Sequence, residues 1–313
     1  MVRLLILFLC ATVAVSAAPG LHVQTFGTPG HPAILFLHGG PGYNAASFEI
    51  GAAQQLADRG FYVITFDQRG SGRSAGVKGT FSFAEAIADI DSILRAKSVD
   101  KAVLVGHSFG GVLAVRAARD LPGRIRGIVL VGAPMDFPET FRTIHRRCEE
   151  IYGQRADSTN LGAIRAVATL DSTSILYATG SFSHAMKAGL YTEPVPTDEA
   201  RSIMQTFRAS AESTKMLSFM TMPPVIGFIN KERYTTLAYL DTLSFLARTL
   251  PIIGLYGEHD GLFDSASVTR LASALGRGNL RVVPQASHSV FLDRRTLFLD
   301  VVEAFIRKVE TLE

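Results

Sequence analysis

Short runs of apolar and β-branched residues recur along the chain, and between them apolar residues return every three or four positions. The runs are typical of strands buried on both faces, and they lie at residues 33–38, 62–66, 102–105, 127–131, 252–256 and 281–283. Residues 81–97 and 296–309 carry the helical spacing, and one stripe of the first holds Phe83, Ile87, Ile90 and Leu94. Because such strands alternate with helices, the pattern predicts an α/β fold with a mostly parallel central sheet flanked by helices.

The alternation of strands and helices stops between residues 134 and 247, where helical and loop patterns take over. An interruption of this size predicts a helical cap or lid at residues 134–247, inserted into one core formed by residues 18–133 and 248–313. Within it, residues 216–229 (MLSFMTMPPVIGFI) are far more apolar than a surface loop should be. They form either the core of the cap itself or the underside of a lid that lines an apolar substrate site.

The first residues have the pattern of a secretory signal peptide. Arg3 precedes an apolar run at residues 4–15, and small residues follow at 16–18. We therefore expect residues 1–17 to be removed and the mature protein to be exported to a periplasmic or extracellular location, with no stable membrane insertion. A retained signal anchor is the alternative, although the run is shorter than the roughly 20 residues of a spanning helix.

Composition narrows the class of protein. Of 313 residues, 47% are hydrophobic and 19% are charged, which excludes a disordered chain. Lys and Arg total 31 against 28 Asp and Glu, and a net charge of +3 is too small at this length to indicate a nucleic-acid partner. Cleavage after Ala17 would remove Cys10 and leave only Cys148, so no internal disulfide is expected. The sequence shows no spacing typical of a metal site, and no metal or other cofactor is expected.

The pentapeptide GHSFG at residues 106–110 fits the pattern G-x-S-x-G, in which a strained turn between a strand and a helix exposes a serine hydroxyl. So short a motif also arises by chance. Here, however, it directly follows the apolar run 102–105 and opens a helical stretch at 112–118, which is the setting that it requires. Ser108 is therefore the predicted nucleophile.

A serine nucleophile needs a base and an acid that orients the base, in the chain order serine, acid, histidine. Of the 8 histidines, His288 directly follows the last predicted strand, whereas His38 and His107 lie inside glycine motifs and are interpreted as turn formers. We predict His288 as the base; a capping or surface histidine is the alternative interpretation. Asp260, just after the strand 252–256, is the predicted acid, and three carboxylates remain as alternatives: Glu258, Asp264 and Asp136.

A glycine-rich stretch, HGGPG at residues 38–42, follows the first predicted strand. Such a turn exposes backbone N–H groups, and a tetrahedral oxyanion needs donors of this kind. We expect the N–H groups of Gly40 and Phe109 to form the oxyanion hole. The stretch DQRGSGRS at residues 67–74 is interpreted as structural, with its Asp and Arg paired to support neighbouring loops.

Together these motifs resemble the α/β-hydrolase family, and HGGPG with DQRGSGRS looks like the proline iminopeptidase group within it. The resemblance covers the predicted core. It implies a triad of Ser108, Asp260 and His288 and a cap inserted after the sixth strand of the sheet. The chain departs from these peptidases at Phe109, where they usually carry Trp. It also shows no match to their amine-binding cap glutamates among Glu149, Glu150, Glu193, Glu199, Glu212 and Glu232.

The predicted function is that of a secreted serine hydrolase that works through an acyl-enzyme. In the first hypothesis it removes the N-terminal residue from small peptides, as the resemblance to proline iminopeptidases implies. The alternative is a carboxylesterase or lipase-like enzyme for small apolar esters, suggested by the apolar cap and the unmatched glutamates. A second alternative is a ligand-binding protein that keeps the fold without catalysis. In each case the expected partner is a small molecule or a short peptide, and the sequence leaves the oligomeric state open.

Overall fold

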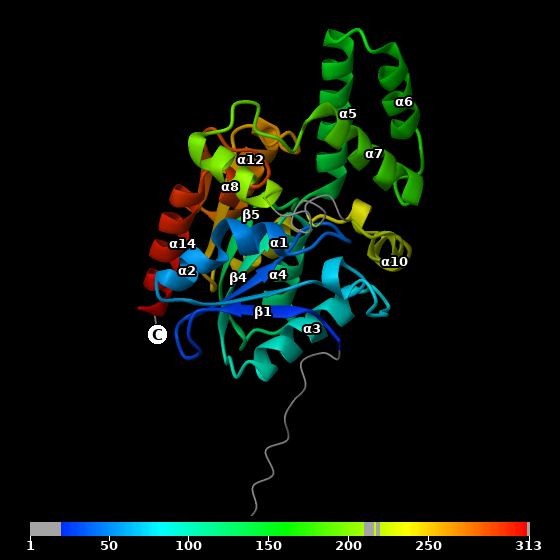
Figure 1. The fold of residues 1–313 in the computed structure, drawn as a ribbon. Coiled ribbons are helices and arrows are strands. Elements are labelled where there is room, and N and C mark those ends of the chain that lie inside the picture. The colour runs from blue at the N-terminus through cyan, green and yellow to red at the C-terminus, as the bar shows by residue number, and fades with distance from the viewer. Residues whose placement is uncertain (1–19, 210–215, 217–219, 312–313) are drawn as a thin grey trace, which may run out of the picture.

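A seven-stranded sheet forms the centre of the protein (Figure 1). The computed structural model describes residues 20–209, 216 and 220–311. The strand order is β1-β3-β2-β4-β5-β6-β7; β1 pairs antiparallel with β3, and the other pairs are parallel. The strands are β1 (Val23–Phe26), β2 (Ala33–Leu37), β3 (Tyr62–Phe66), β4 (Ala102–His107), β5 (Ile125–Val131), β6 (Ile252–Gly257) and β7 (Leu280–Val283). The predicted α/β fold with a mostly parallel sheet is therefore confirmed.

Two details of the sheet differ from the expectations. Strand β1 was not predicted, because Gln24 and Thr25 at its centre are exposed and break the apolar pattern. The long break in the strands follows β5, the fifth strand in chain order, rather than a sixth. A break after the sixth strand would require two strands before β2, the first of the parallel strands. The described residues form only one strand there, β1.

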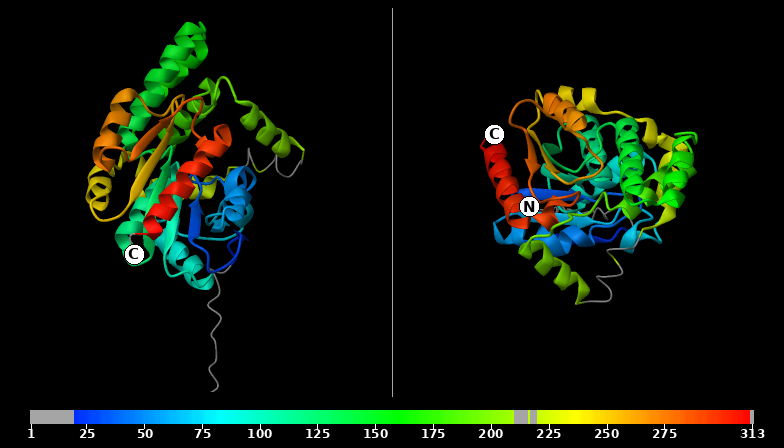
Figure 2. Two further views of the ribbon diagram at one scale, coloured as in Figure 1. Left: turned by 90° about the vertical axis from the view of Figure 1, so that its left-hand side faces the viewer. Right: turned by 90° about the horizontal axis from the view of Figure 1, so that it is seen from above.

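Helices cover both faces of the sheet because alternate side chains of each buried strand point to opposite sides. Leu35 and Leu37 of β2 belong to one apolar cluster, and Ile34 and Phe36 belong to the other. The views in Figure 2 show α12 and α14 on opposite sides of the strands. The first face is covered by α3 (Phe83–Ala96), α4 (Phe109–Asp120) and α12 (Ser265–Leu275). The second is covered by α1 (Ala46–Phe48), a π-helical turn (Glu49–Ala53), α2 (Gln54–Asp58), α13 (Val290–Asp293) and α14 (Arg295–Glu310).

Local sequence accounts for the start of α3. The Ser82 side chain accepts a hydrogen bond from the Glu85 backbone N–H, while the Glu85 carboxylate accepts one from the Phe81 N–H. The first contact satisfies an N–H group that a helix start leaves without an intrahelical partner, and the second belongs to the residue before the cap. The predicted apolar stripe lies buried against the sheet, as its spacing requires: Phe83, Ile87, Ile90 and Leu94.

Between β5 and β6 the described residues form helices, with one isolated bridge between Asp136 and Ala238. We refer to residues 134–247 as the insertion. Its longest helix, α5, packs against α6 and α7, and the three stand together beyond the sheet edge where β5 ends (Figure 1). The helices are α5 (Phe137–Gln154), α6 (Ser158–Ala168), α7 (Ile175–Ala188), α8 (Asp198–Arg208), α10 (Met222–Glu232) and α11 (Leu240–Leu246), with a 3-10 turn at Tyr234–Thr236.

The predicted signal peptide, residues 1–17, lies outside the described residues. Across the ranges that the structure describes, no helix combines the length and the apolar character needed to cross a membrane. Cys148 is buried in α5 with a free thiol, and burial raises the pKa of that thiol to about 12.

Candidate active site

Ser108 lies in a tight turn between β4 and α4. Its backbone has φ 52° and ψ −124°, a conformation that L-residues seldom adopt. Two hydrogen bonds fix the turn: the Ser108 N–H donates to the Val131 oxygen at 2.8 Å, and the Gly111 N–H donates to the Ser108 oxygen at 2.9 Å. The strand, turn and helix that the motif requires are thus present, and Ser108 is half-buried at the start of the helix.

The two glycines of the motif are needed because backbone atoms approach them closely. A Cβ atom on Gly106 would lie 2.5 Å from the Gly111 Cα atom. One on Gly110 would lie 2.0 Å from the Leu37 oxygen, at the end of β2. Since real Cβ atoms do not come within 3.0 Å of such neighbours, a larger side chain at either position would push α4 away from the sheet.

His288 and Asp260 are in direct contact. The distance between His288 Nδ1 and Asp260 Oδ2 is 2.8 Å, and the residues are 5% and 2% exposed. Because a carboxylate accepts hydrogen bonds, Nδ1 carries the ring proton, which leaves Nε2 as the nitrogen that can take up a proton. The other carboxylate oxygen of Asp260 accepts the Leu262 N–H at 3.1 Å, which holds this carboxylate in place.

The three other carboxylates that the sequence left open have different partners. Asp136 accepts the Glu139 N–H as the cap of α5, and Asp264 accepts the Ser267 N–H as the cap of α12. Glu258 lies against the Gln285 N–H at 3.4 Å. The geometry therefore favours Asp260 as the partner of His288.

Glycines that follow two strands show that these side chains gather at one edge of the sheet. A Cβ atom on Gly39, two residues after β2 ends, would lie 2.9 Å from the Ser108 Cβ atom. A Cβ atom on Gly132, directly after β5, would lie 3.0 Å from His288 Nδ1 and 3.1 Å from Asp260 Oδ2. Because β4 lies between β2 and β5, Ser108 stands at the strand end between these two glycines.

His107 also joins the turn of Ser108 to His288. Its ring centroid lies 4.9 Å from that of His288, and its Nε2 donates to the His288 backbone oxygen at 3.1 Å. Burial, and next the neighbouring His288, hold the pKa of His107 well below its usual value, so the ring is neutral. The interpretation of His107 as a turn former was wrong, since it is the last residue of β4. Its contact with a residue 181 positions away carries no local sequence signal.

The two candidate oxyanion donors belong to the start of α4 and to the loop after β2. Phe109 is the first residue of α4, and the first N–H groups of a helix have no intrahelical acceptor. Gly40 has φ +126°, and a Cβ atom there would lie 2.6 Å from the Gly42 nitrogen. Glycine is thus required at position 40 by both the backbone conformation and the close approach of the next turn.

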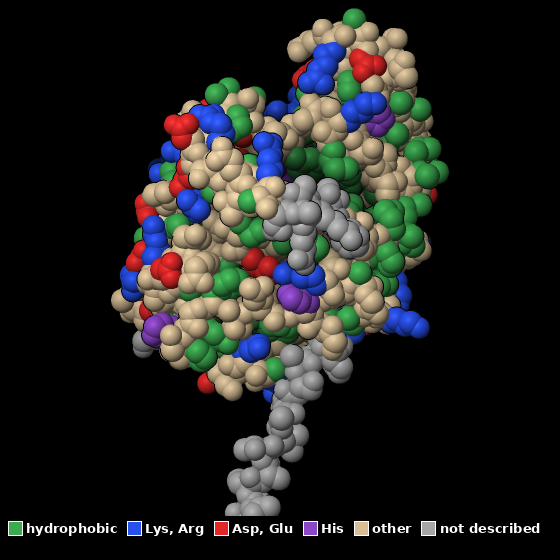
Figure 3. Space-filling model, viewed as in Figure 1, with side chains coloured by type: hydrophobic (Ala, Val, Ile, Leu, Met, Phe, Trp, Pro, Cys, Tyr) green, Lys and Arg blue, Asp and Glu red, His purple; other side chains and the backbone are tan. Residues whose placement is uncertain are grey.

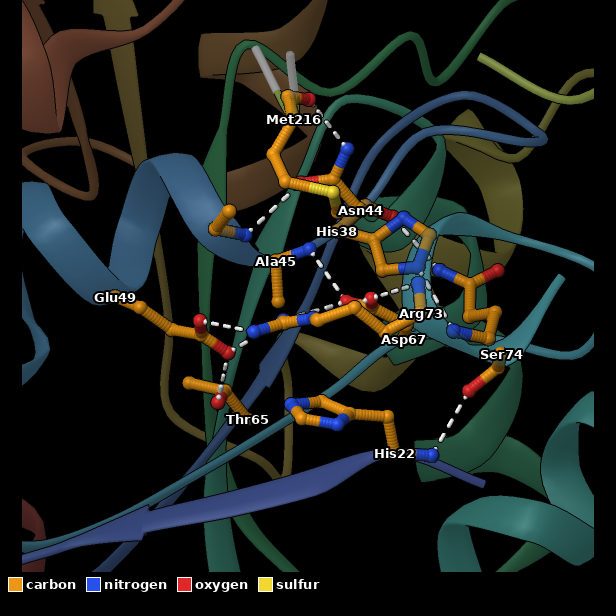
Figure 4. A network of polar contacts seen from close by, with 12 residues as sticks. His22, His38, Asn44, Ala45, Glu49, Thr65, Asp67, Arg73, Ser74 and Met216 are labelled. Carbon is orange, nitrogen blue, oxygen red and sulfur yellow. Dashed lines mark hydrogen bonds and ion pairs between the residues drawn. The ribbon is translucent and has the colours of Figure 1, made fainter. Parts of the chain in front are cut away.

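A buried network of charges lies beneath this loop (Figure 4). Asp67 is fully buried and accepts the Ala45 N–H at 2.9 Å, and the Arg73 guanidinium contacts both Asp67 and Glu49. Burial alone would raise the pKa of Asp67, but the hydrogen bonds from Arg73 and from the Ala45 N–H bring it below its usual value. The expected pairing of Asp and Arg within residues 67–74 is confirmed.

A short stretch of the insertion, residues 190–193, contacts the loops of both Asp260 and His288. The Leu190 oxygen accepts the Gly261 N–H at 2.8 Å, and the Tyr191 oxygen accepts the Ser287 hydroxyl at 2.9 Å. The Tyr191 ring stands edge-on to the His288 ring with 4.9 Å between centroids. Glu193, 3% exposed, contacts His259 Nδ1 at 2.8 Å. Sequence reasoning missed these contacts because they depend on how the insertion returns to the core.

The apolar segment at residues 216–229 divides between two environments. Pro224, Val225, Phe228 and Ile229 are buried, whereas Met220, Met222 and Ile226 are exposed. Phe228 stands edge-on to Phe109 with 5.0 Å between ring centroids, so α10 packs beside the start of α4. Figure 3 shows a hollow between the lobe of α5–α7 and the body of the protein, with hydrophobic side chains at its wall.

Comparison with known proteins identifies the fold. Residues 32–295 match the sequence profile of the family described as the alpha/beta hydrolase fold. A proline iminopeptidase of Saccharolobus solfataricus is 26% identical over 292 residues, which span 89% of this chain and 86% of that protein. A Variovorax paradoxus protein named as a carbamate hydrolase is 37% identical over 116 residues, but this match spans only 36% of this chain and 42% of that protein.

One solved structure is similar to this protein in its three-dimensional fold as well as in sequence. It is a proline iminopeptidase-related protein from Thermus thermophilus, 25% identical, with a TM-score of 0.67. The superposition covers 92% of this chain and 94% of that one, so it includes the core and the insertion. Among the residues that the structure describes, no group of three or more His, Cys, Asp and Glu side chains could hold a metal ion.

Proposed function

The chain belongs to the alpha/beta hydrolase fold family as a serine hydrolase, and from that premise we propose that it cleaves its substrate through an acyl-enzyme formed on Ser108. The observation that carries the proposal is the contact of 2.8 Å between His288 and Asp260 at the sheet edge where Ser108 follows β4. A buried imidazole held by a carboxylate is the arrangement that activates a serine hydroxyl.

In the first step Ser108 Oγ attacks the substrate carbonyl carbon while His288 Nε2 takes the hydroxyl proton. The proton then passes from Nε2 to the leaving group, and the bond between the carbonyl carbon and that group breaks. Asp260 holds the imidazole in the tautomer that leaves Nε2 without a proton, and it stabilises the imidazolium that forms. Water later attacks the acyl-enzyme by the same route, and Ser108 recovers its proton.

Negative charge develops on the substrate oxygen in the tetrahedral intermediate. We assign its stabilisation to the N–H groups of Gly40, in the loop after β2, and of Phe109, the first residue of α4. Donors fixed before the reaction stabilise this charge without having to reorient, and one such donor contributes about 10²- to 10³-fold to kcat in other hydrolases.

The contacts of the cap glutamates favour carboxylic esters as substrates. Glu193 contacts His259, and Glu232 accepts the Phe83 N–H at 2.7 Å. Glu149, Glu150 and Glu199 lie against arginines at the surface, and Glu212 lies outside the described residues. Each described glutamate of this set thus has a partner other than a substrate amine. The exposed apolar side chains of residues 220–226 and the apolar hollow in Figure 3 suit an acyl chain better than an ammonium group.

Removal of an N-terminal residue from small peptides is the second candidate. It is supported by HGGPG and DQRGSGRS and by the full-length similarity to a proline iminopeptidase. In either case we propose that residues 134–247 act as a cap over the sheet edge and that the substrate is a small molecule or a short peptide.

A direct test separates catalysis from substrate choice. Labelling by a fluorophosphonate should occur in the wild type and disappear in Ser108→Ala, with Ser71→Ala as the matched control that keeps the label. Short-chain aryl esters should be hydrolysed, and prolyl arylamides should not. Rapid turnover of prolyl arylamides, with little turnover of esters, would favour the second candidate instead.

Export is a separate proposal that rests on the pattern of residues 1–17. The intact mass of the protein recovered from an expressing bacterium tests it. A mass reduced by the first 17 residues in the periplasm or medium is expected, and an uncleaved chain retained inside the cell would contradict it.

A further inference from the structure

His38 is buried beside the loop that carries Gly40, and its ring is hydrogen-bonded at both nitrogens. The Gln68 backbone N–H lies 2.9 Å from His38 Nε2, and the Gln68 side-chain amide donates to the His38 oxygen at 2.8 Å. A backbone N–H can only donate, so Nε2 is the acceptor and carries no proton. The second nitrogen, Nδ1, lies 2.8 Å from the Gly39 oxygen and therefore donates to it.

Its environment keeps this ring neutral. His38 is 1% exposed, and burial lowers its pKa more strongly than the nearby Asp67 raises it. A protonated ring would direct an N–H group at the Gln68 N–H, which adds a reason for the neutral form. The ring therefore has one fixed tautomer and one fixed donor, directed at the Gly39 carbonyl.

That donor determines which way the Gly40 N–H points. The Gly39–Gly40 peptide bond is trans, since the described cis bond of this loop is Gly40–Pro41. In a planar trans peptide the C=O and the following N–H point in opposite directions. Because the Gly39 oxygen points at the His38 ring, the Gly40 N–H points away from it. The Gly39 Cα atom lies against Ser108, where a Cβ atom would be 2.9 Å from the Ser108 Cβ atom.

We propose that His38 is a positioning residue for the oxyanion hole: by holding the Gly39 carbonyl, it aims the Gly40 N–H at the oxygen of the tetrahedral intermediate. The inference rests on the proposed function. His38 touches neither substrate nor nucleophile and transfers no proton. It acts through the peptide plane between Gly39 and Gly40, which would otherwise be free to rotate in a loop built of glycines.

Two amide substitutions separate this role from a merely structural one. The side-chain amide of Asn can occupy the place of Nδ1 and donate to the Gly39 oxygen, but it cannot reach Gln68. The amide of Gln can occupy the place of Nε2 and accept the Gln68 N–H, but it provides no donor to Gly39. His38→Asn therefore keeps the contact that the proposal needs, and His38→Gln keeps the contact that anchors the turn.

The measurement is kcat and KM on a short-chain aryl ester, normalised to the active sites that a fluorophosphonate titrates. We expect His38→Gln to lower kcat by about 10- to 10²-fold with KM nearly unchanged, because an oxyanion donor acts in the transition state. Its affinity for a trifluoromethyl ketone analogue should fall in proportion. His38→Asn should stay within about 3-fold of wild type. Equal losses in both variants, or wild-type kcat in His38→Gln, would overturn the proposal.

A second measurement uses the unaltered enzyme. Side-chain ¹⁵N NMR of the histidines should show His38 protonated at Nδ1 across neutral pH, and protonation at Nε2 would overturn the assignment. Failure of the underlying function is distinguishable, because it would appear as wild-type protein whose ester turnover does not depend on Ser108.

Discussion

His107, the residue directly before Ser108, donates a hydrogen bond to the backbone oxygen of His288 at 3.1 Å and packs its ring against the His288 ring. The turn that holds Ser108 and the loop that holds His288 are therefore joined by one buried side chain. A movement of the Ser108 turn is therefore expected to shift the His288 loop, and a movement of the loop to shift the turn.

Replacement of His107 by leucine should weaken both folding and catalysis. It leaves the buried His288 carbonyl without its donor, which should lower the free energy of unfolding by about 1–3 kcal/mol. A displaced His288 should lower kcat by about 10-fold or more. Urea denaturation and ester turnover measure the two effects, and His107→Gln, which can restore a donor at the Nε2 position, is the matched control. Equal behaviour of the two variants would contradict the role of the hydrogen bond.

The pKa of His107 predicts a loss of stability in acid. Burial, followed by the influence of His288, sets its folded-state pKa well below the unfolded value of 6.5. Its contribution to stability is therefore complete above pH 6.5 and is lost as the pH falls toward the folded-state pKa. Each pH unit below 6.5 should cost up to about 1.4 kcal/mol. Urea denaturation from pH 7 to pH 5 should show this loss in the wild type and a flatter profile in His107→Gln. Parallel profiles would refute the assignment.

Substitution of Asp260, the proposed acid, should abolish most of the activity without unfolding the protein. Asp260→Asn keeps the size of the side chain but favours the wrong tautomer of His288, so kcat should fall by about 10⁴-fold. Asp264→Asn should remain close to wild type in kcat, because Asp264 caps α12 and does not contact His288. Steady-state ester hydrolysis decides the matter, and near-normal turnover by Asp260→Asn would assign the acid to another residue.

A methyl group at Gly39 should interfere with the nucleophile directly. The new Cβ atom would lie 2.9 Å from the Ser108 Cβ atom, so Gly39→Ala should shift the hydroxyl and lower kcat by about 10²-fold. Gly123→Ala is the control, since a Cβ atom there meets nothing within 4 Å. Thermal unfolding confirms that both variants fold, and wild-type kcat in Gly39→Ala would show that the two residues do not pack as described.

Much of the fold was predictable because local patterns dictate it. The runs that became β2, β3 and β4 are wholly buried, so each reads as an uninterrupted apolar segment. Strand β1 was not predicted because, among the described strands, it pairs with β3 alone, and its exposed Gln24 and Thr25 interrupt the apolar pattern.

The candidate site likewise contains residues that local sequence patterns predict and residues that they do not. Ser108 stands in a motif because its turn needs glycines at fixed spacing, and Asp260 and His288 could be placed by the ends of strands. The roles of His38 and His107 depend on a hydrogen bond to a strained glycine loop and on a contact across 181 positions, respectively. Neither of these two contacts produces a recognisable pattern in the spacing of residues along the sequence.

The contacts of residues 190–193 bear on how this enzyme can be modified. One stretch of the insertion holds the Gly261 N–H, the Ser287 hydroxyl and His259, which flank Asp260 and His288 in sequence. The insertion is therefore not an interchangeable module. A replacement taken from a relative would have to reproduce these three contacts, and one that merely offered a better-shaped pocket would alter the turnover rate together with the substrate range.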